Sequence, residues 1–234
     1  MARKVLARVW KNGSNGSAQI LAWCQENTSA ADVWASNLNA EAWAEAEGFA
    51  ESHTLYAAER LQQIGIDLGG GGHYAMLYFL VRHFRPDAVL ETGVAAGHSS
   101  RAVLTAMKCN DHGALFSSDF PYFRLKNPER FIGILVEDEL KQRWTLKIKG
   151  DAVNLPELVR MAPPISLFHY DSDKTDHGRQ HALAHVEPHL TDDAIIVFDD
   201  IQDTDHFQNL VKTTNRNWKV FHFGGKYLGV LLPS

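Results

Sequence analysis

The sequence predicts an α/β fold in which a doubly wound, mostly parallel sheet lies between helices, and three observations lead to this expectation. From about residue 87 onward, strand-like and helix-like segments alternate along the chain. The strand-like segments are apolar on both faces, as strands of a buried parallel sheet are. Near the end, Gly224-Gly225 separates two strand-like runs and predicts a two-residue hairpin, so the last strand should run antiparallel to the sheet.

The expected elements follow from this alternation of apolar runs and polar breaks. The strands are expected at residues 87–91, 114–118, 144–149, 165–170 and 194–198. The helices that follow them are expected at residues 98–109, 132–141, 153–161, 176–187 and 203–214. With the closing hairpin, this order predicts a Rossmann-like domain.

The part of the chain before about residue 87 is expected to be helical. Asn39 suits the N-cap of a helix, and alanine, glutamate, leucine and aromatic residues dominate from there to Ile64. Four glycines at 69–72 then break the chain, and a second apolar helix is expected from about His73 to Phe84. We therefore predict an N-terminal helical extension over residues 1–72 and an α/β domain over residues 73–234.

Composition excludes several classes of protein. The net charge of −5 argues against nonspecific nucleic-acid binding, which needs a basic face. No apolar run reaches the roughly 18 residues of a membrane span, and no signal-peptide core follows the basic start, so we expect a cytoplasmic protein. Cys24 and Cys109 form no metal-type spacing and read as free thiols, although one disulfide between them stays open.

A glycine-containing segment, Glu91 to Gly97, lies between a predicted strand and a predicted helix. Glycines there permit positive φ angles and let the backbone approach a ligand, but the spacing fails the GxGxxG dinucleotide fingerprint. Ser99 can cap the helix or donate to a ligand. Asp119 follows the next strand, near the usual offset of a carboxylate that grips ribose hydroxyls. After the third strand, Asp151 and Ala152 can present a carboxylate or an amide to a purine amine.

These features together resemble class I S-adenosylmethionine-dependent methyltransferases over about residues 73–234. The resemblance places Gly93 and Gly97 beneath the methionine part of the cofactor, Asp119 on the ribose and Asp151 on the adenine side. It gives Glu91 the task of orienting the loop or the amino end of methionine. The expected cofactor contacts are Glu91, Gly93, Gly97, Ser99, Asp119, Asp151 and Ala152. The alternative is a glycine turn for helix packing beside an unrelated surface aspartate.

Carboxylates also end the fourth and fifth predicted strands. Asp171 follows one strand, Asp199 and Asp200 follow the other, and neighbouring parallel strands would bring the three together. Such carboxylates repel one another unless a cation or protons intervene. An all-oxygen set suits Mg²⁺, Ca²⁺ or Mn²⁺, and a bound ion would polarise a substrate hydroxyl. Lys174, with its pKa lowered beside the cation, can accept the hydroxyl proton.

This second set is similar to metal-dependent O-methyltransferases of the catechol and caffeoyl-coenzyme A type, which have D-x-x-K after the fourth strand and D-N after the fifth. The resemblance implies Asp171, Asp199 and Asp200 as metal ligands, with Asp171 and Lys174 also taking part in catalysis. Asp200 departs from the family's usual asparagine. The segment 198–201 also resembles sugar- and antibiotic-modifying methyltransferases and the cephalosporin-hydroxylase-like group. The alternative is that Asp199 caps a helix and Lys174 pairs with Asp173.

The resemblances imply methyl transfer from S-adenosylmethionine to a hydroxyl of a small molecule, assisted by a divalent metal, with Mg²⁺ foremost. The expected partner is that hydroxylated acceptor, with no nucleic acid and no membrane. Because methyltransferases of this type are often dimers, the resemblance also allows a homo-oligomer. The rivals are a metal-dependent hydroxylase-like enzyme on the same fold and a non-catalytic nucleoside-binding or scaffold protein. A nicotinamide dehydrogenase is disfavoured by the missing GxGxxG.

Overall fold

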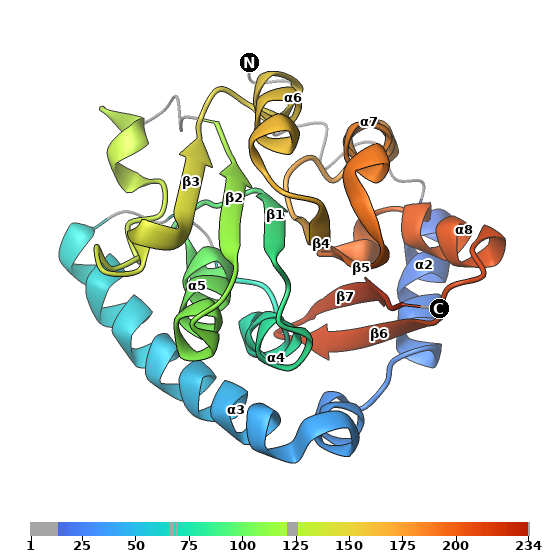
Figure 1. Ribbon diagram of the computed structural model, residues 1–234. Helices are drawn as coiled ribbons and strands as arrows, with labels where there is room; N and C mark the ends of the chain where they lie inside the picture. The colour runs from blue at the N-terminus through green and yellow to red at the C-terminus, as the bar shows by residue number, and fades with distance from the viewer. Residues whose placement is uncertain (1–13, 66–67, 69, 121–125, 234) are drawn as a thin grey trace.

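The structure is a computed structural model, and it describes residues 14–65, 68, 70–120 and 126–233 (Figure 1). Within these residues, seven strands form one sheet in the order β3-β2-β1-β4-β5-β7-β6. The strands are β1 (Ala88–Thr92), β2 (Ala114–Ser118), β3 (Trp144–Lys147), β4 (Ile165–Tyr170), β5 (Leu190–Phe198), β6 (Trp218–Phe223) and β7 (Lys226–Leu231). Strands β1 to β5 pair in parallel, and β7 is antiparallel to both β5 and β6. The predicted sheet is confirmed.

The closing hairpin forms where the two glycines predicted it. Gly224 and Gly225 have φ angles of 56° and 82°, and two consecutive left-handed residues match the twist of a tight hairpin. The hairpin places β7 between β5 and β6, so Lys226, the first residue of β7, returns toward the carboxyl edge of the sheet.

Helices cover both faces of the sheet (Figure 1). Their bounds are α2 (Ser14–Glu26), α3 (Ala31–Ile64), α4 (Tyr74–Phe84), α5 (His98–Asn110), α6 (Asp151–Met161), α7 (Asp176–Val186) and α8 (His206–Thr213). Short 3₁₀ turns are η1 (Pro128–Phe131), η2 (Lys141–Arg143), η3 (Glu187–His189) and η4 (Ile201–Asp203). The core on one face includes α3, α4 and α5, and the core on the other includes α2, α6, α7 and α8. Consecutive β1 residues, Val89 and Leu90, enter opposite cores, as the two-residue period of a strand requires.

The expected helix at 132–141 is wrong. This stretch forms turns between η1 and η2, and Gly133 has a φ angle of 70°. The backbone N–H of Gly133 donates to the carbonyl of Ala95 (2.9 Å), and the N–H of Leu135 donates to Ala96 (3.0 Å). The segment therefore uses its backbone to hold the β1–α5 loop, and Gly133 packs against the Trp144 ring too closely for any side chain.

Asn39 caps a helix as expected, within a longer helical segment than the sequence indicated. Its φ and ψ angles of −161° and 94° interrupt α3, and its side-chain oxygen accepts a hydrogen bond from the Ala42 N–H (3.0 Å). The residues ahead of it, from Ala31, form a further helical stretch joined at this kink. The capped portion then runs to Ile64, as the composition predicted.

The N-terminal helices share the core of the α/β region. Trp34 and Trp43 of α3 meet the ring of Phe79 in α4 edge-on, at centroid distances of 5.8 and 5.7 Å. Trp23 of α2 stacks on Trp218 of β6 at 5.7 Å. Both cysteines are free thiols. No helix among the described residues is both long and apolar enough to cross a bilayer.

Candidate active site

A glycine loop, residues 93–97, joins β1 to α5 at the carboxyl edge of the sheet. It lies where the strand order reverses between β1 and β4, the usual ligand position in doubly wound folds. Gly93 and Gly97 have φ angles of 83° and 95°. A Cβ atom on Gly93 would collide with the Asp171 carbonyl oxygen, and one on Gly97 would lie 2.9 Å from the Gly133 Cα. Both positions therefore require glycine.

Asp119, just beyond β2, is 7% exposed and faces the glycine loop. Its Oδ2 accepts hydrogen bonds from the N–H groups of Val94 (3.0 Å) and Ala95 (2.7 Å), and its Oδ1 accepts from Phe120 (2.7 Å). Burial raises the pKa of Asp119 to about 6, although these hydrogen bonds act to lower it. A carboxylate offers about four lone-pair positions, so capacity remains for a ligand hydroxyl. Ribose binding by Asp119 stays a prediction that this geometry permits.

The raised pKa of Asp119 predicts a pH-dependent cofactor affinity. An ionised carboxylate accepts hydrogen bonds from ribose hydroxyls, and a protonated one accepts them less well. With a pKa of about 6, the affinity for S-adenosylhomocysteine should be about tenfold weaker at pH 5 than at pH 7. Calorimetric titration at both pH values measures this. Asp119→Asn should bind more weakly at both values and lose the pH dependence; an unchanged profile in that variant would assign the titration to another group.

Glu91 is fully buried below the loop and is not placed to contact a ligand directly. Its Oε2 accepts hydrogen bonds from the hydroxyls of Ser100 (2.6 Å) and Ser117 (2.8 Å). The Nδ1 atom of His169 lies 3.6 Å from Oε1, an ion-pair contact longer than a hydrogen bond. Burial opposes ionisation, but His169, Ser100 and Ser99 together lower the pKa of Glu91. Of the two tasks expected for Glu91, the geometry suits orientation of the loop.

Asp151 connects the ends of β2 and β4. Its Oδ1 accepts a hydrogen bond from Ser118 (2.5 Å), and its Oδ2 accepts one from Ser172 (2.5 Å). It is the first residue of α6, and Ala152 beside it is exposed. Contact with adenine stays a prediction for both residues.

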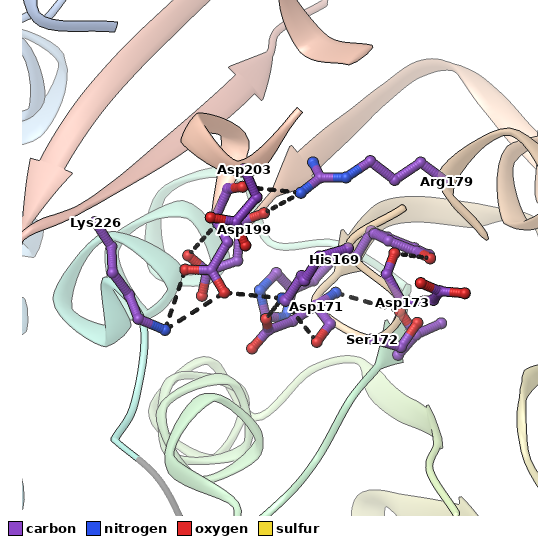
Figure 2. A network of polar contacts seen from close by, with 12 residues as sticks. His169, Asp171, Ser172, Asp173, Arg179, Asp199, Asp203 and Lys226 are labelled. Carbon is purple, nitrogen blue, oxygen red and sulfur yellow. Dashed lines mark hydrogen bonds and ion pairs between the residues drawn. The ribbon is translucent and has the colours of Figure 1, made fainter. Parts of the chain in front are cut away.

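Five charged residues form what we call the acid–lysine cluster: Asp171, Lys174, Asp199, Asp200 and Lys226. Figure 2 labels Asp171, Asp199 and Lys226 among them. Lys174 Nζ contacts Asp171 Oδ1 and lies 3.1 Å from Asp200 Oδ2. Lys226 Nζ lies 3.1 Å from Asp200 Oδ1. The strand ends of β4, β5 and β7 thus converge as the sequence predicted for β4 and β5. Among the described residues, Lys174 pairs with Asp171 and Asp200 and not with Asp173.

Asp199 is 1% exposed, and one of its carboxylate oxygens lacks a hydrogen-bond partner among the described residues. The other oxygen, Oδ1, accepts from the Asp200 N–H (2.9 Å). Burial and the neighbouring Asp171 and Asp200 raise the pKa of Asp199. A Cβ atom on Gly72 would collide with the free oxygen, Oδ2. The 70–73 segment therefore lies directly over this carboxylate.

Lys174 differs from the expectation in the direction of its pKa. Burial alone would lower it, but Asp171, Asp200 and Asp199 together raise it above the ordinary lysine value. With this cluster around it, the side chain is a protonated ammonium group. A lowered pKa would need a neighbouring metal cation, whereas the side chains that Lys174 contacts, Asp171 and Asp200, are anionic.

The three carboxylates predicted as metal ligands do not form one common site: Asp200 pairs with lysines, whereas Asp171 and Asp199 lie near His169. Both oxygens of Asp200 contact ammonium groups, and Lys174 also lies against Asp171. Among the described residues, the set with ligand atoms within 4.8 Å of one another is His169, Asp171 and Asp199. This set replaces one expected oxygen donor with an imidazole, which suits Mg²⁺ less well. The all-oxygen set is therefore not assembled, and metal binding stays a prediction.

Sequence reasoning missed four residues of this site. Arg179 of α7 is fully buried, and its Nη2 donates to the backbone carbonyls of Asp199 (3.1 Å) and Asp200 (2.9 Å). In Figure 2, Arg179 and Lys226 reach the cluster from opposite sides. The other three are His169, Lys226 and Gly72. Lys226 and Gly72 were missed because they are distant in sequence from the rest of the site. A signal existed for His169, which directly precedes the polar end of β4, and for Arg179, an arginine on the covered face of a predicted helix.

Comparisons with known proteins agree with this geometry. A family model described as a methyltransferase domain matches residues 90–201, which hold the glycine loop and most of the acid–lysine cluster. No curated protein sequence matches the chain significantly.

Three solved structures share the fold at low sequence identity. One, described as an O-methyltransferase from Klebsiella pneumoniae, is 14% identical, with a TM-score of 0.58, over 99% of this chain and 96% of that one. The O-methyltransferase TomG from Streptomyces achromogenes, involved in tomaymycin synthesis and solved with S-adenosylmethionine, is 16% identical, with a TM-score of 0.58, over 87% and 96%. An O-methyltransferase from Bacillus cereus, in complex with S-adenosylhomocysteine, is 14% identical, with a TM-score of 0.55, over 89% and 99%.

The strand order, the two obligatory glycines and the family match lead to one conclusion. Residues 90–201 match a methyltransferase domain, and the described part of the chain has the Rossmann-like fold of the three O-methyltransferase structures.

Proposed function

We propose that the protein transfers a methyl group from S-adenosylmethionine to a hydroxyl oxygen of a small molecule. The observation that carries this proposal is the contact between the two halves of the site: Gly93 packs against the backbone of Asp171. The loop expected to hold the cofactor therefore adjoins the cluster that can act on an acceptor. The cofactor, when bound, supplies the sulfonium methyl group. O-Methyltransferases among the solved structures of the same fold support the choice of a hydroxyl acceptor.

The acid–lysine cluster suits the activation of a hydroxyl group. The Lys174 ammonium, held between Asp171 and Asp200, can stabilise negative charge as an acceptor oxygen loses its proton. The Oδ2 atom of Asp199, which has no hydrogen-bond partner among the described residues, can accept that proton. Gly72 lies over this oxygen, so an acceptor must displace the 70–73 segment or enter beside it. Magnesium assistance and a homo-oligomeric state stay predictions of the resemblance.

Titration of S-adenosylhomocysteine into the purified protein tests the cofactor part of the proposal. We expect saturable binding of one molecule per chain, both with Mg²⁺ and with EDTA, because the contacts expected for the cofactor lie in the glycine loop and Asp119. A panel of phenols, sugars and polyketides then tests for methyl transfer. Absence of binding in both buffers would show that the glycine loop, residues 93–97, is not a nucleoside site and would favour a different ligand.

Lys174→Ala and Asp199→Ala should each lower turnover at least about 100-fold, while the affinity for S-adenosylhomocysteine changes little. The reason is that both side chains lie at the ends of β4 and β5, beyond the glycine loop. Steady-state rates and calorimetry on the same preparations measure the two quantities. Lys212→Ala, on the exposed face of α8, is the control and should turn over normally. Normal turnover in Lys174→Ala or Asp199→Ala would remove that residue from the mechanism.

A further inference from the structure

Asp200 is the position at which this chain departs from the D-N pattern, and its side chain is fully engaged. Lys226 Nζ lies 3.1 Å from its Oδ1, and Lys174 Nζ lies 3.1 Å from its Oδ2. The backbone at Asp200 is left-handed, with a φ angle of 52°. Arg179 holds it there by donating to the carbonyl oxygens of Asp199 and Asp200, which precede and follow the Asp200 Cα atom. The carboxylate is thus fixed between two ammonium groups.

Lys226 provides the charge that matches this departure. It begins β7, directly after the Gly224-Gly225 turn, and it pairs with Phe223 at the turn end of the hairpin. An asparagine at position 200 would carry no charge, whereas an aspartate adds one negative charge. The Lys226 ammonium cancels that charge at ion-pair distance. Asp200 and Lys226, far apart in sequence, therefore form one charge-compensated pair.

We propose that Lys226, acting through Asp200, holds the Lys174 ammonium against Asp171, so that a lysine occupies the place of a divalent ion among these carboxylates. The inference rests on the proposed function, since it describes how the same site activates a hydroxyl. A divalent ion could use Asp200 only by separating its oxygens from two ammonium groups, and an ion on Asp171 would lie beside the Lys174 ammonium. Lys226 is a positioning residue in this arrangement, because it acts on Lys174 through Asp200.

Binding of Mn²⁺ to the protein saturated with S-adenosylhomocysteine tests this, measured by electron paramagnetic resonance and calorimetry. The variants are Lys226→Met, Asp200→Asn and the double variant, with Lys219→Met on β6 as the control for loss of a hairpin lysine. Lys226→Arg tests whether any cation restores the wild-type behaviour. Melting temperatures show that each variant is folded.

Charge alone predicts the order of the Mn²⁺ affinities. The wild type should not saturate at about 1 mM Mn²⁺. Lys226→Met leaves Asp200 with one ammonium partner and should bind at least about tenfold more tightly than the wild type. The double variant loses one charge of each sign and should match the wild type, and Asp200→Asn alone, with one negative charge fewer, should not exceed the wild type. Lys219→Met and Lys226→Arg should match the wild type.

Tight binding of one Mn²⁺ per wild-type chain, unaffected by Lys226→Met, would overturn the inference and assign the ion to His169, Asp171 and Asp199. Equal affinities in all variants would also overturn it, because Lys226 would then have no effect on the carboxylates. Failure of the proposed function gives a different result: no S-adenosylhomocysteine binding, whatever the order of the Mn²⁺ affinities.

Discussion

Gly93→Ala is expected to abolish measurable binding of S-adenosylhomocysteine, with a loss of affinity of at least about 100-fold. Two causes act together. The φ angle of 83° costs an alanine about 1–2 kcal/mol, and the added Cβ atom would collide with the Asp171 carbonyl. That collision is with backbone at the end of β4, which cannot move aside as a flexible side chain can. The loop must therefore shift at the position where the methionine part of the cofactor is expected.

Gly225→Ala is the matched control for this experiment. Gly225 has nearly the same φ angle, 82°, but no atom lies within 4 Å of the Cβ position. It should show the cost of the left-handed backbone alone, with a lowered melting temperature and normal cofactor affinity. Calorimetry and thermal unfolding of both variants separate strain from collision. Normal cofactor binding by Gly93→Ala would show that the cofactor does not use this loop.

Glu91→Ala is expected to destabilise the fold by about 3–5 kcal/mol, the usual cost of removing one partner of a buried ion pair. Glu91 is 0% exposed and His169 is 1% exposed, so solvent cannot replace the lost contact. The substitution also leaves the Ser100 and Ser117 hydroxyls without their acceptor. Urea unfolding at pH 7 measures the change.

Two further variants show which part of Glu91 matters. Glu91→Gln keeps an acceptor for the serines but removes the charge facing His169, so its loss should be about half as large. Glu139→Gln breaks an exposed ion pair with Lys108 and should leave the unfolding midpoint unchanged. The lowered pKa of Glu91 means that its stabilising effect is present above its unfolded-state pKa and is lost as the pH falls through the folded value. A midpoint in Glu91→Ala equal to that of the wild type would show that this network contributes nothing.

Local patterns were sufficient for much of the fold. The bounds of β2 and β4 agree with the sequence expectation, and Asn39 and the glycine pair at 224–225 act as their local chemistry predicts. The segment 132–141 could not be read in this way. Its helical composition yields to hydrogen bonds with the glycine loop and to the contact between Gly133 and Trp144. These are contacts between residues separated along the chain, which no local window contains.

The residues of the site also fall into those that local patterns predict and those that depend on long-range contacts. The glycines, Asp119 and the carboxylates after β4 and β5 were visible because each directly follows an apolar strand. Lys226 was not, since its place beside Asp200 depends on β7 entering the sheet next to β5. The direction of the Lys174 pKa depends on the convergence of Asp171, Asp200 and Asp199, which together outweigh burial.

The position of β7 has a consequence for the order in which the chain acquires its structure during synthesis. β7 follows every other strand in sequence, yet it lies between β5 and β6. Until residues 226–231 have left the ribosome, β5 exposes unpaired backbone groups, and β6 has no strand through which to join the sheet. A nascent chain can thus form β1 to β5 first and complete the acid–lysine cluster only when Lys226 arrives. Chaperones that shield strand edges should matter most at this last step.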